Sequence, residues 1–246
     1  MQTNLGGKTV LITDGVASLG KATALAFARE GANLLMAGAV GIDLLDQGAH
    51  EAQQLGVRVV IDRCDMGDQT QVRKLVQKAL AEFGHLDIVV NNARPAPTML
   101  SLQDIPFELW KTLIGEQLTG TLMLCQEALP GMIEHGWGRI INYIGLAAFL
   151  GSDAPNSAVE LGLAGLSRGI AREYGKYNIT ANCIALAGIE TGEEGGPFDC
   201  APSDRDPLPR WGKPEEVSFL AVSLASENAG YVTGQCLLAN GGKYFL

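Results

Sequence analysis

The stretch Lys8–Gly20 reads KTVLITDGVASLG and decides the fold. Its apolar run Thr9–Thr13 predicts a buried strand, and the turn that follows leads into a helix. In an α/β protein this strand–turn–helix unit is the place for a phosphate-binding loop, whose glycines let the backbone approach a pyrophosphate. Here Asp14 and Ser18 hold the first two glycine positions, and only Gly20 remains of the three.

Short apolar runs alternate with helical patterns outward from this unit. Strands are expected at 9–13, 33–37, 58–61, 86–90, 139–144, 180–185 and 235–238. Helices are expected at 19–30, 42–55, 68–83, 107–134, 156–176 and 214–226. This alternation predicts a doubly wound, Rossmann-type α/β fold with a seven-stranded parallel sheet flanked by helices. No linker divides residues 1–246, so a single domain is expected, with the irregular stretch 192–210 as a lid over a site or a surface loop.

Composition excludes several classes of protein. Apolar residues make up 47% of the chain and charged residues 18%, which supports a large core and argues against disorder. The net charge of −9 disfavours nucleic acid or an anionic membrane as a partner. No apolar run is long enough to span a bilayer and no signal peptide is visible, so a cytoplasmic location is expected. Five scattered cysteines and three dispersed histidines predict reduced thiols and no metal site.

Several segments together resemble the short-chain dehydrogenase/reductase family along essentially the full chain. They are VLITDGVASLGKATALAFAREGAN, RCDMGD, LDIVVNNAR, GRIINYIG, GLSRGIAREYGKYNITANCIA and RWGKPEEVSFLAVSLASENAGYVTGQCLLANGGKY. The resemblance implies the same doubly wound fold and, for an intact member, oxidoreductase chemistry with NAD(P). Because one fold hosts many functions, each functional position has to be compared separately.

The positions that hold the dinucleotide in this family are mostly replaced. In the family's T-G-x-x-x-G-x-G loop, Asp14 lies beside the expected pyrophosphate. Two like charges about 4 Å apart repel by about 4 kcal/mol at an effective dielectric near 20, or about a thousandfold in affinity. Alternatively, Asp14 caps the next helix and fills the place of the anion itself. Gly38 supplies neither acid nor base for the ribose, and Arg94 replaces a glycine near the nicotinamide, so we expect no cofactor on this chain.

The catalytic Asn, Ser, Tyr and Lys of the family are also replaced. The Tyr-x-x-x-Lys segment becomes Asn156 to Glu160, so an amide replaces the titratable phenol and a carboxylate replaces the ammonium. The serine position falls on Gly145, or on Ile144 if the loop shifts by one, and the asparagine position falls on Gln117. With the cofactor loop lost as well, we expect no catalytic residues and no intrinsic hydride transfer.

Two predicted helices carry more apolar surface than one sheet can cover. The helix at 156–176 is apolar on more than one face, and Gly162, Gly165 and Gly169 mark a side where another backbone can come close. The helix at 107–134 shows a similar apolar excess. In the family these two helices form a four-helix dimer interface, and the C-terminal strand and tail form a second contact. Assembly with another chain is therefore expected.

Three functional hypotheses follow. The first is a non-catalytic subunit that assembles, as a tetramer, with a competent NAD-dependent hydroxyacyl-CoA or alcohol dehydrogenase of the same family, with NAD on that partner. The replacements are similar to those in an inactive family subunit whose complex oxidises a 3-hydroxyacyl-CoA. The second is a cofactor-independent lyase, hydratase or isomerase in which Tyr143 and Glu160 form a new acid–base pair. The third, a homo-oligomeric ligand sensor, has no distinguishing residue.

Overall fold

A parallel sheet of seven strands lies at the centre of the protein, in the order β3-β2-β1-β4-β5-β6-β7. The computed structural model describes residues 2–15, 18–39, 42–92, 100–151, 154–190 and 201–245. The strands are β1 (Thr9–Ile12), β2 (Asn33–Gly38), β3 (Val59–Arg63), β4 (Ile88–Asn91), β5 (Gly138–Gly145), β6 (Ile179–Leu186) and β7 (Cys236–Ala239). The strand order reverses between β1 and β4, whose carboxyl ends form the switch point of the sheet. The predicted doubly wound, seven-stranded fold is confirmed.

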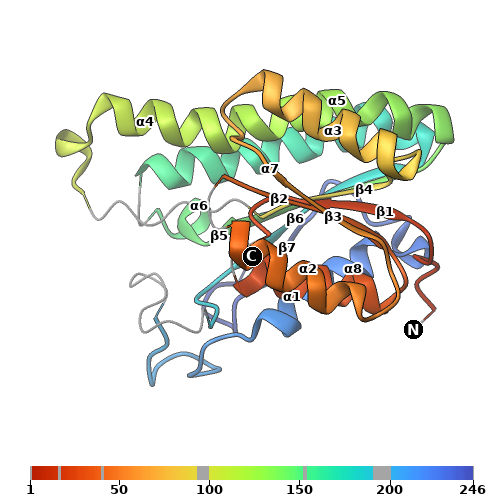
Figure 1. The fold of residues 1–246 in the computed structure, drawn as a ribbon. Coiled ribbons are helices and arrows are strands. Elements are labelled where there is room, and N and C mark those ends of the chain that lie inside the picture. Colours follow the sequence, from red (N-terminus) through yellow and green to blue (C-terminus); the bar gives the residue numbers. More distant parts are fainter. Residues whose placement is uncertain are drawn as a thin grey trace.

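Helices cover both faces of the sheet (Figure 1). One layer holds α1 (Ser18–Arg29), α2 (Ile42–Gln53) and α8 (Pro214–Ala225). The other holds α3 (Gln69–Phe83), α4 (Phe107–Leu113), α5 (Gly120–His135) and α7 (Ala154–Tyr174). Short helical segments are η1 (Leu102–Asp104), α6 (Ala147–Leu150), η3 (Gly175–Tyr177) and η5 (Glu227–Ala229). Because both faces are covered, the inner strands are buried along their whole length and read as continuous apolar runs.

Alternate residues of β5 face opposite helical layers. Tyr143 packs with the core under α1, α2 and α8, whereas Ile144 packs with the core under α7. This alternation follows from the two-residue repeat of a strand. It decides which functional positions meet at the carboxyl end of the sheet. None of the described helices combines the length and apolar character that a membrane span requires.

The predicted helix 107–134 is interrupted in the structure. α4 ends at Leu113, the π-helical segment η2 (Ile114–Thr119) follows, and α5 continues to His135. The backbone N–H of Gly120 donates to the carbonyl of Gly115, five residues earlier. A π turn holds one extra residue, which apolar periodicity in the sequence does not resolve. The interruption brings Gln117 to a buried position.

Two glycines of α5 provide a matched test of its packing. A Cβ on Gly120 would lie 2.5 Å from the carbonyl oxygen of Met66, whereas a Cβ on Gly131 would meet nothing within 4 Å. We expect Gly120→Ala to lower the free energy of unfolding by about 1–3 kcal/mol because the site is overpacked. Gly131→Ala should raise it by about 0.5–1 kcal/mol through helix propensity. Urea unfolding measures both values, and equal effects would contradict the close contact at Gly120.

Candidate functional site

The described ends of the former phosphate loop, at Asp14 and Gly20, are held close together. Asp14 follows β1 with φ of 48°, in the left-handed region that glycine favours and aspartate tolerates. Asn92, after β4, donates its side-chain N–H to the Asp14 carbonyl at 2.8 Å and its backbone N–H to the Thr13 hydroxyl at 3.0 Å. A Cβ on Gly20 would collide with the Asp14 carbonyl oxygen, so this glycine is required by packing alone.

The charges of the loop do not suit an anion. Burial raises the pKa of the Asp14 carboxyl. Among the described residues nothing donates a hydrogen bond to that carboxylate, so the predicted helix cap is not formed by them. Asp65, at the family's adenine-contact position, accepts the backbone N–H of Gly67 at 2.8 Å. Burial, and then the charge of Asp65, raises the pKa of Glu116 in η2. Asp14 therefore places a partly buried carboxyl beside the position of a pyrophosphate, whereas Asp65 keeps the side chain that contacts the adenine in the family.

Ser18 connects α1 to the segment that follows β6. Its hydroxyl donates to the carbonyl of Glu190 at 3.1 Å, which joins the start of α1 to the segment after β6. The strands β4 and β5 lie between β1 and β6 in the sheet, so this bond links segments across the carboxyl edge. A dinucleotide bound in the manner of the family would run along this edge.

The end of β2 differs from the expectation in one respect. Gly38 is buried there and carries no acid or base, but it pairs with Arg63 of the neighbouring strand β3. The exposed Arg63 therefore places a guanidinium group beside Gly38, which has no charged side chain of its own. Sequence reading missed this group because neighbours across a parallel ladder are far apart along the chain. Arg94 lies outside the described residues.

Glu160, at the family's lysine position, is a buried acceptor for backbone groups. Its two carboxylate oxygens accept the backbone N–H groups of Gly145 and Ala148, each at 2.9 Å. Hydrogen bonds to a charged acceptor are stronger than neutral ones. Gly145, the family's serine position, thus contributes its backbone to the site. The Glu160 carboxylate therefore connects α7 to the last residue of β5 and to α6.

The two remaining catalytic positions hold buried amides. Asn156, near the start of α7, is 4% exposed, and Gln117 in η2 is 6% exposed. Neither side chain titrates, so neither supplies the proton that the family's tyrosine exchanges with its substrate. The four positions are brought to the carboxyl end of β5 and the adjoining helices, but they no longer form an acid–base set.

The predicted Tyr143–Glu160 pair is wrong. Tyr143 is 1% exposed, and its hydroxyl lies 2.9 Å from the hydroxyl of Thr23 on α1. Glu160 belongs to α7, on the opposite face of the sheet. The two-residue repeat of β5 separates them, because Tyr143 points away from the α7 layer. Burial also raises the pKa of Tyr143 well above its usual range, so the hydroxyl stays protonated near neutral pH and is not available as a base.

The histidines are less dispersed than the sequence suggested. The rings of His85 and His135 lie 6.3 Å apart, and His85 contacts the Asp87 carboxylate at 3.0 Å. These residues come together because the loops before β4 and β5 lie at the same edge of the sheet. Even so, no group of three or more candidate metal ligands occurs among the described residues.

The cysteines in the described ranges are free thiols. They are Cys64, Cys125, Cys183 and Cys236. Cys183 and Cys236 pair in register across β6 and β7, a proximity that their spacing in the sequence does not reveal. Cys200 lies outside the described residues.

Comparison with known proteins agrees with this architecture. The family model described as Enoyl-(Acyl carrier protein) reductase matches residues 15–243. The chain belongs to the short-chain dehydrogenase/reductase family, an oxidoreductase family. It is 34% identical over 243 residues to the 3-oxoacyl-[acyl-carrier-protein] reductase of Thermotoga maritima, covering 97% of this chain and 98% of the relative. It is 32% identical over 248 residues to the (2S)-[(R)-hydroxy(phenyl)methyl]succinyl-CoA dehydrogenase subunit BbsD of Thauera aromatica, with 96% of each chain covered.

Solved structures show the same fold. Levodione reductase superposes with a TM-score of 0.89 at 25% identity, covering 98% of each chain. A short-chain dehydrogenase/reductase from Serratia marcescens gives a TM-score of 0.88 at 28% identity, covering 97% of this chain and 98% of the other. The scaffold is thus that of the short-chain dehydrogenase/reductase family.

Asp14 should give a pH-dependent stability effect. Its folded-state pKa is raised above the ordinary 3.8, so the ionised carboxylate destabilises the fold and stability falls as pH rises through that window. We expect Asp14→Asn to be more stable than the wild type at neutral pH, with a difference that shrinks as pH falls toward the ordinary value. Asparagine also tolerates the left-handed conformation.

Urea unfolding at several pH values checks this, with the exposed Asp204→Asn as the control. A gain that does not depend on pH, or one that Asp204→Asn shares, would contradict the assignment to the half-buried charge.

Glu160 should be a stability residue. In Glu160→Gln an amide N–H₂ replaces one acceptor and faces a backbone N–H, so one hydrogen bond is lost and a buried donor is unpaired. We expect the free energy of unfolding to fall by about 1–3 kcal/mol. Chemical denaturation measures it, with the exposed Glu134→Gln on α5 as the control. Equal stability of Glu160→Gln and the wild type would show that the two bonds are not important.

Proposed function

We propose that this chain is a non-catalytic subunit of an oxidoreductase complex, paired with a competent NAD-dependent short-chain dehydrogenase. On this proposal it binds no dinucleotide, carries out no hydride transfer by itself, and supports the active subunit across a shared interface. NAD and the catalytic Ser, Tyr and Lys belong to the partner. The complex is expected to be a tetramer.

One observation carries this proposal. In the family the lysine holds the ribose and lowers the pKa of the tyrosine, so the reaction needs a cation there. Glu160 holds that position with a buried carboxylate bound by the N–H groups of Gly145 and Ala148. An anion that is fixed by two backbone donors cannot take the role of the cation. Asp14 in the phosphate loop and the Ser18–Glu190 bond across the crevice support the same reading.

The outer face of α7 supports assembly. Leu161 on α7 is 54% exposed and Leu122 on the neighbouring α5 is 40% exposed. A Cβ added at Gly165 or Gly169 would meet nothing within 4 Å, so their backbone is open to a neighbour. Gly162 differs from the prediction, because the side chain of Leu118 already packs against it within this chain. The exposed leucines and two open glycines support the proposal that a partner binds at this face.

A second apolar surface lies at the β7 edge of the sheet. Phe219 on α8 and Phe245 in the C-terminal tail are 62% and 74% exposed. The edge strand β7 is half-buried at every residue, unlike the fully buried β5 and β6. Two separate apolar surfaces on one chain are what a tetramer with two kinds of interface requires.

The relatives indicate the chemistry of the complex. Thermotoga maritima 3-oxoacyl-[acyl-carrier-protein] reductase acts on an acyl thioester, and BbsD is named as a subunit of a hydroxyacyl-CoA dehydrogenase. We infer that the partner oxidises or reduces a hydroxyacyl-CoA or a related alcohol. The two side chains of Tyr143 and Glu160 lie on opposite faces of the sheet, so they do not form the acid–base pair that a lyase, hydratase or isomerase would need.

Co-expression tests the proposal. We expect the chain to co-purify with a family member that is encoded beside it and has an intact glycine-rich loop and Tyr-x-x-x-Lys. Leu161→Glu should abolish co-purification, because a charge is buried in an apolar contact. Leu55→Glu is the matched control, since Leu55 is 44% exposed at the end of α2, away from α7.

Titration with NADH tests the cofactor part separately. The isolated chain should give no saturable binding at micromolar concentrations, whereas the complex should bind through its partner. Micromolar binding by the isolated chain together with alcohol oxidation would overturn the proposal. So would a wild-type chain that never associates with the neighbouring family member.

A further inference from the structure

A cavity of about 530 Å³ lies at the carboxyl ends of β6 and β7. Its walls are the segment after β6, the irregular segment 202–212, the first half of α8 and the C-terminal tail. The apolar lining includes Ile189, Leu208, Val217, Leu220, Leu238 and Phe245. This volume falls within the range of about 300–1,000 Å³ that is usual for small-molecule sites. The carboxyl edge of a parallel sheet is also where such sites occur.

The walls are joined to one another by specific bonds. The backbone N–H of Leu208 donates to the carbonyl of Gly241 at 3.1 Å. Gly241 and Gly242 have φ of 63° and 80°, which turns the tail sharply toward segment 202–212. Lys243 donates to the carbonyl of Ala201 and to the Asp206 carboxylate at 3.0 Å. These bonds join segment 201–212 to the C-terminal tail, so the cavity is a built feature rather than a gap beside one loop.

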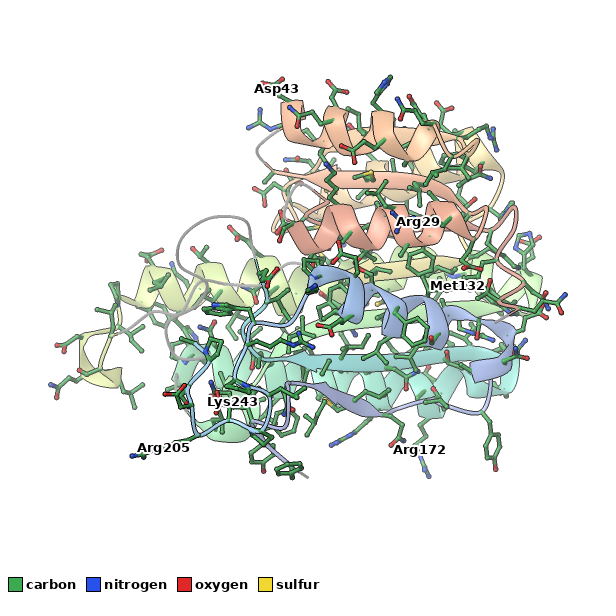
Figure 2. The ribbon with its side chains drawn as sticks, turned by 90° about the horizontal axis from the view of Figure 1, so that it is seen from below. Arg29, Asp43, Met132, Arg172, Arg205 and Lys243 are labelled. Carbon is green, nitrogen blue, oxygen red and sulfur yellow. The ribbon has the colours of Figure 1, made fainter. Side chains whose placement is uncertain are left out.

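The charged groups on the walls neutralise one another. Lys243 and Asp206 pair at 3.0 Å with side chains only 18% and 15% exposed. Arg210 binds both oxygens of Glu216, at 2.7 and 2.8 Å, and this interaction lowers the pKa of Glu216 to about 2. In Figure 2, Lys243 of the C-terminal tail lies against the body of the protein, whereas Arg205 projects away from it.

The remaining polar side chain is also satisfied. Asn240 donates to the carbonyl of Tyr244 at 2.8 Å and accepts the backbone N–H of Gly242 at 2.9 Å. Among the described lining residues, therefore, the polar side chains already have partners within the wall. What the cavity offers a ligand is apolar contact.

The cavity is separate from the replaced catalytic positions. Gly145, Asn156 and Glu160 are not among its described lining residues, and neither is Asp14. It lies on the β6–β7 side of the sheet, whereas the former phosphate loop lies at the end of β1. A ligand here would contact segment 202–212, α8 and the tail together.

We propose that this cavity, named here the β6–β7 pocket, is a binding site for an uncharged, largely apolar small molecule. The paired charges at its walls leave no formal charge to attract an anion or a cation, and the apolar lining supplies the affinity. Because the ligand bridges three segments, its binding also stabilises the fold. The pocket shares Phe219 and Phe245 with the second apolar surface, so binding is to be measured on the chain alone and in complex.

Titration with the neutral dye Nile red tests the proposal. The full chain should bind it with saturable fluorescence and a rise in melting temperature. Leu208→Trp fills the rim of the pocket from a residue that is 51% exposed, so folding should tolerate it. The substitution should lower the affinity for Nile red by at least about tenfold. Leu55→Trp, at a site 44% exposed on the other side of the molecule, should change affinity less than about twofold.

Further variants and a charged dye keep the test decisive. Ala239→Phe fills the pocket from inside and should act as Leu208→Trp does, with circular dichroism reporting its folding. The anionic dye anilinonaphthalene sulfonate should bind more weakly than Nile red. Tighter binding of the anion would overturn the ligand class. Binding of Nile red that is equal in Leu208→Trp and Leu55→Trp, or absent from the wild-type chain both alone and in complex, would overturn the site.

Discussion

The close approach of α1 to the ends of β1 and β4 is the constraint on which the rest of the structure depends. Gly20 touches the Asp14 carbonyl, and Asn92 binds that same carbonyl from β4. Any side chain at Gly20 would push the helix away from the sheet at its switch point. This requirement belongs to packing and not to nucleotide chemistry. It is therefore compatible with a loop whose other glycine positions hold an acid and a serine.

The replaced residues are integrated into the fold. Glu160 accepts two backbone N–H groups at the turn after β5, and Ser18 binds the carbonyl of Glu190 after β6. A buried carboxylate is costly unless donors are placed around it, and here the turn supplies them. At the carboxyl end of the sheet these side chains hold neighbouring segments together. At positions 18 and 160, where the residue differs from the family pattern, the side chain forms hydrogen bonds to nearby backbone groups.

Under the proposed function, the apolar face of α5 and α7 and the β6–β7 pocket have different roles. The exposed apolar residues of α5 and α7 lie on one helical layer. The β6–β7 pocket lies at the carboxyl ends of β6 and β7, beside α8 of the other layer. On the proposed function, the chain combines an exposed apolar surface for another subunit with an apolar cavity that is partly open to solvent. The pocket shares Phe219 and Phe245 with the second apolar surface, so a ligand there and a subunit bound at that surface would contact the same residues. The paired charges around Lys243 and Arg210 hold the pocket walls in place.

The sequence by itself determined the doubly wound fold, because alternating apolar runs and helical patterns are local and periodic. It also placed Asp14, Gly145 and Glu160 at functional positions through spacing relative to recognisable segments. Only the tertiary structure decided what these residues touch. The strand repeat put Tyr143 on the face opposite Glu160, and the π turn in η2 escaped the helical pattern. The β6–β7 pocket was invisible for the same reason, since its walls join segments that only long-range packing brings together.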